Sequence, residues 1–159
     1  SKISSSLPLV EKISKEHSAL VSKFQDKNYP KGKLIEEYTE FLNECPQYYR
    51  AYYERAILYT HVGRYKEAIA DNEILIKHNE RLWSDALINK AEALYFMKEY
   101  GLALKSANRY FEVEEQTESE AYKIRAEIFK KLKMYDEHNA DMRMYKKKEK
   151  ENKYSYCQK

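Results

Sequence analysis

The sequence predicts an all-α protein built from antiparallel helix hairpins that stack one on the next. Only three Gly and three Pro occur in 159 residues, whereas the abundant Lys, Glu, Ala, Leu and Tyr favour helices joined by short connections. Apolar residues recur three, four and seven positions apart, as they do on amphipathic helices. The same pattern returns at a fixed step of 35 residues, which indicates a repeat protein.

The repeat is carried by columns of small and aromatic residues that keep one register along the chain. Three of these columns, each with members 35 residues apart, are Ala51, Ala86 and Ala121; Ala56, Ala91 and Ala126; and Tyr65, Tyr100 and Tyr135. Small side chains in the second column allow the two helices of a hairpin to approach closely, and the tyrosines are expected to fill the space between successive hairpins. A degenerate copy at a step of 34 precedes them, as expected of a terminal unit.

Each repeat unit divides into two helices joined by a very short connection. The connection is marked by Gly63 in one unit and by the polar steps Lys98-Glu99 and Lys133-Met134 in the next two, which are too short for anything but an antiparallel hairpin. The predicted helices lie near residues 8–27, 33–45, 49–62, 65–78, 83–97, 100–115, 118–132 and 135–152. The predicted units are 15–46, 49–80, 84–116 and 119–150, in a single domain over residues 1–152 that is followed by a basic flexible tail, residues 153–159.

Composition and charge indicate a soluble chain with an uneven distribution of charge. No window approaches the roughly 18 uninterrupted apolar residues of a membrane span, and residues 1–8 lack the apolar stretch of a signal peptide. Cys45 and Cys157 are far apart, which argues against a disulfide framework and favours reduced thiols in the cytoplasm. The net charge is +3, but seven Lys or Arg residues and only two Glu residues follow from Arg143 onward, so the C-terminal segment is strongly basic.

No arrangement of residues in the sequence indicates catalysis, a cofactor or a metal site. The four histidines are scattered, and the HExxH and CxxC spacings, a Gly-rich phosphate loop and a nucleophilic Ser turn are all absent. Glu54 and Glu92 could form an acid and base pair, because general acid–base chemistry needs two carboxyl groups. On a helical array, solvated recognition charges are the better interpretation, so the sequence predicts a protein that is not an enzyme.

The columns resemble the tetratricopeptide repeat (TPR) family, whose unit of about 34 residues has the pattern W-x2-L-G-x2-Y, then A-x3-F, then P. The residues that carry the resemblance are Tyr52, Ala56, Tyr59, Ala68 and Pro46. The resemblance implies a right-handed superhelix, an α-solenoid of three to four units plus a C-terminal capping helix. His138 replaces a small residue in the last unit, so the final helix is expected to tilt away or to face solvent.

The resemblance also implies where a ligand binds, because the first helix of each unit lines a concave face that commonly receives an extended or helical peptide. The inward positions would be Arg50, Tyr53, Glu54, Ile57, His61, Asp85, Ile88, Asn89, Glu92, Phe96, Glu120, Lys123, Ile124, Glu127, Lys130 and Lys131. They make a groove of mixed charge with apolar contacts. The clamp with which some family members hold a chaperone's C-terminal carboxylates does not match, and Glu54 would repel a carboxylate, so tight binding of such a tail is not expected.

The sequence therefore predicts a protein-interaction scaffold that binds a peptide or helical segment of a partner protein, in an adaptor, co-chaperone or complex-assembly role. A nucleic-acid binder is one alternative, because Lys146 to Lys150 is a basic run with Tyr145, Tyr154 and Tyr156 nearby. The predicted groove has no basic stripe, which argues against that alternative. Self-association is the other alternative, since a short array exposes its terminal repeats to another copy.

Overall fold

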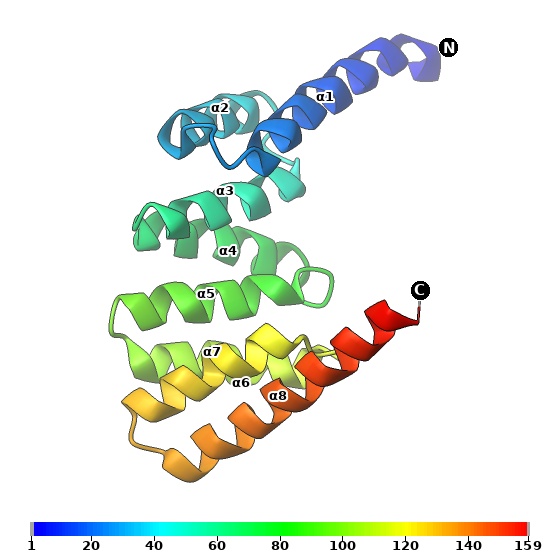
Figure 1. The fold of residues 1–159 in the computed structure, drawn as a ribbon. Helices are drawn as coiled ribbons and strands as arrows, with labels where there is room; N and C mark the ends of the chain where they lie inside the picture. The colour runs from blue at the N-terminus through cyan, green and yellow to red at the C-terminus, as the bar shows by residue number, and fades with distance from the viewer. Residues whose placement is uncertain (1, 159) are drawn as a thin grey trace. The chain divides into compact units, whose positions relative to one another are not determined.

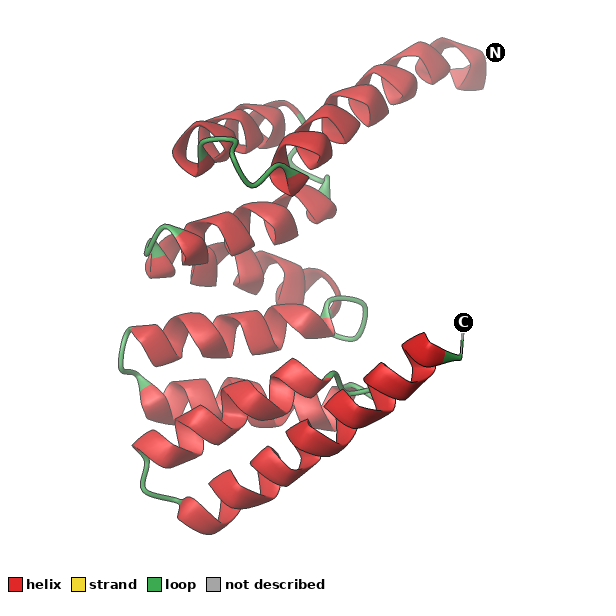
Figure 2. Ribbon diagram, in the orientation of Figure 1, coloured by secondary structure: helices red, strands yellow, loops and turns green. Residues whose placement is uncertain are grey.

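The computed structural model describes the backbone of residues 2–158 and the side chains of residues 8–158, and within that range it consists of helices and loops alone (Figure 1, Figure 2). The eight helices described are α1 (Lys2–Gln25), α2 (Lys31–Glu44), α3 (Tyr49–His61), α4 (Tyr65–Asn79), α5 (Ser84–Phe96), α6 (Tyr100–Val113), α7 (Ser119–Lys131) and α8 (Tyr135–Cys157). Each corresponds to one predicted helix. The predicted all-α class is therefore confirmed.

Helices α3, α5 and α7 all end in the same left-handed turn. The turn residues are Gly63, Lys98 and Lys133, with φ of 79°, 64° and 60°. In each turn the following N–H donates to the carbonyl oxygen five residues earlier, in the pairs Arg64 to Tyr59 (2.8 Å), Glu99 to Leu94 (2.9 Å) and Met134 to Phe129 (2.9 Å). This is the Schellman motif, which satisfies carbonyl groups at a helix C-terminus. Two lysines thus occupy the conformation that the first turn gives to glycine.

We expect Lys98→Gly to stabilise the chain by about 1 kcal/mol, because a side chain in the left-handed region costs about 1–2 kcal/mol and glycine carries part of that cost as lost entropy. The reciprocal change, Gly63→Lys, should destabilise it by a similar amount. No heavy atom beyond the chain neighbours lies within 4 Å of a Cβ built on Gly63, so the backbone conformation alone sets the cost. Urea denaturation followed by helical circular dichroism measures both changes. The free energy of unfolding should rise for Lys98→Gly and fall for Gly63→Lys, and a change in the same direction for both would contradict this explanation.

Contacts between helices divide the chain into two compact units, Ser1–Arg64 and Tyr65–Lys159, and the predicted single domain spans both. In the first unit α1 packs against α2, and α2 packs against α3. The interior is filled by aliphatic and aromatic side chains such as Leu34 and Tyr38. Ala56 is also buried, as predicted for the small residue of the sequence repeat at 49–80.

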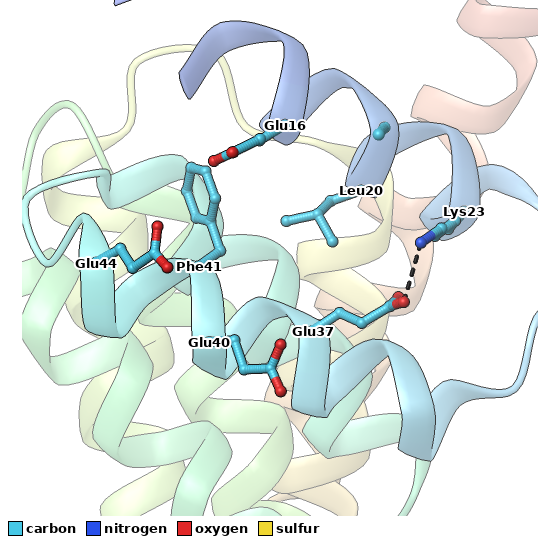
Figure 3. Close-up of a pocket in the computed structure, with 8 residues that line it drawn as sticks. Glu16, Leu20, Lys23, Glu37, Glu40, Phe41 and Glu44 are labelled. Carbon is cyan, nitrogen blue, oxygen red and sulfur yellow. Dashed lines mark hydrogen bonds and ion pairs between the residues drawn. The ribbon is translucent and has the colours of Figure 1, made fainter. Parts of the chain in front are cut away.

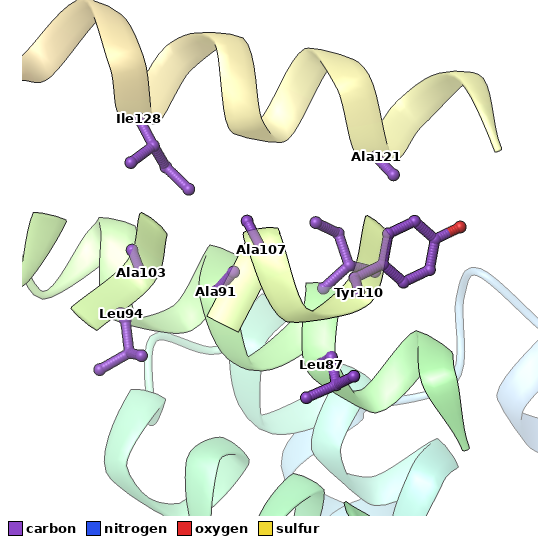
Figure 4. Close-up of a cluster of buried hydrophobic side chains, with 9 residues drawn as sticks. Leu87, Ala91, Leu94, Ala103, Ala107, Tyr110, Ala121 and Ile128 are labelled. Carbon is purple, nitrogen blue, oxygen red and sulfur yellow. The ribbon is translucent and has the colours of Figure 1, made fainter. Parts of the chain in front are cut away.

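In the second unit each helix from α4 to α8 packs against the next, and α5 also contacts α7. Figure 4 shows the buried cluster that α5, α6 and α7 share, with the labelled residues Leu87, Ala91, Leu94, Ala103, Ala107, Tyr110, Ala121 and Ile128. Ala91, Ala103 and Ala126 are fully buried, in agreement with the predicted close approach of the helices.

The three tyrosines that recur at the start of α4, α6 and α8 do not make equivalent contacts. Tyr65 on α4 stacks on Phe96 of α5 with ring centroids 5.3 Å apart, so it does pack against the following hairpin. Tyr100 contacts Tyr95 of its own hairpin at 5.7 Å. Tyr135, at the start of α8, is exposed. The prediction that it fills a space between hairpins is wrong, because within the described chain no later hairpin packs against α8.

Helix α8 is longer and more firmly attached than predicted. Residues 153–157, assigned to a flexible tail, are helical, since the segment has no Gly or Pro to end the helix. His138 bonds through Nδ1 to the carbonyl oxygen of Ala126 at 2.8 Å, and Arg125 donates two hydrogen bonds to Asp141 at 2.8 and 2.9 Å. These bonds hold α8 against α7, so the expected tilt away from the array does not occur, whereas the other expectation, that α8 faces solvent, agrees with its mostly exposed side chains.

Candidate functional site

Glu54, predicted to face the groove, is buried inside the first unit and only 3% exposed. Its Oε2 accepts a hydrogen bond from the Tyr38 hydroxyl at 2.8 Å and lies 2.8 Å from Nε2 of His17, while Oε1 accepts one from Nε of Arg50 at 3.1 Å. Burial, and secondarily the charge of Glu54, raises the pKa of Tyr38 strongly. Glu54 therefore joins α1, α2 and α3, and the prediction that it meets a ligand is wrong. Being shielded from solvent, it also cannot act with Glu92 on a substrate.

The other predicted positions of α3 lie at the surface of the first unit. Arg50 and His61 are exposed, and Tyr53 and Ile57 are half-buried. The Arg50 guanidinium lies 4.9 Å from the centroid of the Tyr53 ring, a cation–π contact that holds both side chains. These four residues stay predicted ligand contacts.

The predicted positions in the first half of α5 differ in exposure. Ile88 is only 7% exposed and belongs to the buried cluster of the second unit, so its prediction as a ligand contact is wrong. Asp85 is exposed. Asn89 is half-buried, and its Nδ2 is buried without a hydrogen-bond partner in the described part of the chain.

The remaining predicted residues of α5 and α7 come together in one pocket of about 210 Å³, which we call the α5–α7 pocket. It is lined by Glu92, Tyr95, Phe96, Glu120, Lys123, Ile124 and Glu127. Tyr95 was not predicted, because the inward positions at the end of α5 were taken to run from Glu92 to Phe96, and Tyr95 is the residue just before Phe96 at the C-terminus of this helix. Lys130 and Lys131 line a neighbouring pocket instead.

The α5–α7 pocket carries three carboxylates and one ammonium group. Nζ of Lys123 lies 3.7 Å from Oε1 of Glu120 and 5.7 Å from the ring centroid of Tyr145 on α8. Among the described side chains no cation pairs with Glu92, and its pKa is raised, first by burial and then by the negative charge of Glu120. A cation placed beside Glu92 would offset both effects.

Two other kinds of feature are absent from the part of the chain that the structure describes. Within that part of the chain, no three His, Cys, Asp or Glu side chains are grouped so that they could hold a metal ion. None of the described helices combines the length and the apolar character needed to cross a membrane.

Comparison with known proteins identifies a fold but no sequence family. No family model matches the sequence, and no curated protein matches it. The crystal structure of MamA is similar over 78% of this chain and 71% of its own, with a TM-score of 0.68 and 17% sequence identity. Two further MamA structures, from AMB-1, have TM-scores of 0.62 and 0.63 at 13% identity and cover 74% and 75% of this chain and 68% and 64% of their own. The chain therefore has the TPR-like helical-repeat fold.

Proposed function

We propose that this chain is a protein-interaction scaffold that binds a segment of a partner protein at the α5–α7 pocket, with a basic side chain of that segment beside Glu92. The observation that carries the proposal is the Glu92 carboxylate itself. It is partly buried, shares the pocket with the carboxylate of Glu120 and forms no ion pair with any side chain of the described chain. Adaptor and complex-assembly roles both require such a site for a partner segment.

The composition of the pocket suits an Arg or Lys side chain better than an acidic or purely apolar one. Its three carboxylates exceed its single ammonium group, and Lys123 is already close to Glu120. A guanidinium group forms paired hydrogen bonds with a carboxylate, and its aliphatic stem packs on apolar surface. Phe96, 47% exposed, and Ile124 offer that surface. The pocket volume of about 210 Å³ is that of one or two side chains, so neighbouring residues of the segment would lie outside it.

A matched set of labelled peptides tests the proposal. Each peptide has the same apolar sequence with Arg, Lys, norleucine or Glu at its centre, and binding is measured by fluorescence anisotropy. We expect the Arg peptide to bind most tightly and Glu92→Gln to weaken it about tenfold, which is about 1.4 kcal/mol. Glu115→Gln, at an exposed carboxylate of the same unit, is the control and should bind like the wild type. Equal binding of the Arg and Glu peptides would contradict the proposal.

The same Glu92→Gln variant should be more stable than the wild type at neutral pH. Folding raises the pKa of the Glu92 carboxyl. The stability that this contributes is fully present below the pKa of the unfolded state and is lost as the pH rises through the pKa of the folded state. Glutamine has no charge to bury, so we expect a gain of at most about 1 kcal/mol at pH 7, discounted for partial exposure, that disappears below about pH 4. Denaturation at both pH values measures it. A variant that loses both stability and binding would point to a damaged fold instead of a lost ligand contact.

A further inference from the structure

Helix α8 carries a continuous basic stripe on its outward face. Its members recur three and four positions apart, which places them on one side of a helix. We call them the α8 stripe: Arg143, Lys146, Lys147, Lys150, Lys153 and Tyr154, all exposed. The acidic residues of this segment, Glu149 and Glu151, lie to either side of the stripe, and Glu149 accepts a hydrogen bond from Ser119. The stripe is therefore a long positive surface that ends in an aromatic ring.

The first unit carries a surface of the opposite charge between α1 and α2. Figure 3 shows this α1–α2 pocket, with Leu20 and Phe41 between the helices and carboxylates around them. Its lining residues are Glu16, Ala19, Leu20, Lys23, Glu37, Glu40, Phe41 and Glu44, and its volume is about 290 Å³. The ammonium group of Lys23 bonds to Glu37 at 2.9 Å, and Lys12 lies 3.6 Å from Glu16, both ion pairs partly exposed.

Two carboxylates of the α1–α2 pocket are left without a cation. Glu40 and Glu44 are exposed, one helical turn apart on α2, and no described side chain forms an ion pair with either. Lys146 and Lys150 have the same four-residue spacing on α8. A helix that crosses the pocket could therefore place two ammonium groups opposite two carboxylates and an aromatic ring near the apolar floor.

We propose that the α8 stripe of one copy of this chain docks into the α1–α2 pocket of a second copy. Each surface is exposed within its own unit. Because the two surfaces differ, the contact is head to tail, and a bound pair still presents one free stripe on one copy and one free pocket on the other. Such an interface makes open chains unless its rotation closes a ring. Exposed ion pairs are weak and screened by salt, so the association is concentration-dependent and is lost at high ionic strength.

Sedimentation velocity of the full chain over a concentration series tests this assembly. At low ionic strength the sedimentation coefficient is expected to rise continuously with concentration, and at high ionic strength the chain should sediment as a monomer. Lys146→Glu with Lys150→Glu reverses the stripe, and Glu40→Lys with Glu44→Lys reverses the pocket. Each double variant alone should stay monomeric. Their equimolar mixture should associate again, because an acidic stripe then meets a basic pocket and a basic stripe meets an acidic one.

A matched control reverses two basic charges outside both surfaces. Lys66→Glu with Lys77→Glu alters exposed residues of α4 and should assemble like the wild type. Circular dichroism of every variant shows whether its helices are intact. A wild type that stays monomeric at all concentrations at low salt would overturn the proposal, as would a mixture that fails to associate.

The alternative occupants of the stripe give different results. If a DNA oligonucleotide or an anionic lipid vesicle binds the wild type while the chain alone stays monomeric, the stripe serves that ligand and the proposal is wrong. None of the substitutions lies in the α5–α7 pocket, so the peptide experiment and this one can fail separately.

Discussion

Glu54→Ala is expected to remove about 3–5 kcal/mol from the stability of the first unit, because it leaves buried polar partners without their shared carboxylate. The Tyr38 hydroxyl, which is fully buried, loses its acceptor at 2.8 Å. His17 loses its contact at 2.8 Å in the same step. The truncation also leaves a cavity where α1, α2 and α3 meet, and that cavity adds its own cost.

The measurement is denaturant unfolding followed by helical circular dichroism, with hydrogen exchange to locate the loss in residues 1–64. Glu36→Ala is the matched control, because Glu36 lies exposed on the neighbouring helix α2 and should change stability by less than about 0.5 kcal/mol. If Glu54→Ala were as stable as that control, the carboxylate would not be the structural link that its contacts indicate.

Arg125→Met is expected to cost about 3–5 kcal/mol in the second unit, because it removes the charge from one side of a buried ion pair. Asp141 is 5% exposed and accepts both of its hydrogen bonds from Arg125, at 2.8 and 2.9 Å. The guanidinium also lies 3.8 Å from the centroid of the Phe111 ring, a contact that methionine replaces only as packing. An unpaired carboxylate is then left between α7 and α8.

The double variant Arg125→Met with Asp141→Leu separates the ion pair from the packing around it. A buried pair replaced by apolar side chains of similar volume is often close to neutral, so the double variant should recover most of the stability that the single change loses. Both are measured by denaturant unfolding, with hydrogen exchange of the α7 and α8 amides. A double variant as unstable as Arg125→Met would show that packing of the guanidinium, and not the unpaired charge, dominates.

The α5–α7 pocket shows how far residue spacing can predict which side chains share one surface. Glu92, Phe96, Lys123 and Glu127 were all predicted to face inward. They line one pocket because α5 and α7 are the first helices of successive sequence repeats. The spacing of residues along one helix predicts which side of it faces the neighbouring helix. The fixed repeat step then predicts the equivalent residues in the next sequence repeat. Tyr95 was missed because it precedes Phe96 by one residue and therefore lies off the predicted inward positions of α5.

The same spacing failed at Glu54 and Ile88. Both stand in columns assigned to the groove, yet both are buried. Ile88 is covered where α5 packs in its cluster. Glu54 is covered by His17, 37 residues earlier in the chain, and by Tyr38, 16 residues earlier. A helical wheel contains no information about side chains that arrive from another helix.

By itself, the sequence determined which segments are helical, where the hairpins turn and which alanines are buried. These features depend on local propensity and on two periods that can be read along the chain, the helical turn and the repeat step. Only the tertiary structure decided which polar side chains form bonds inside the protein and which are left without one. That decision depends on the angle and offset at which separate helices pack, because a shift of a few ångströms determines whether a carboxylate meets a buried hydroxyl, as Glu54 does, or is left without a cation, as Glu92 is.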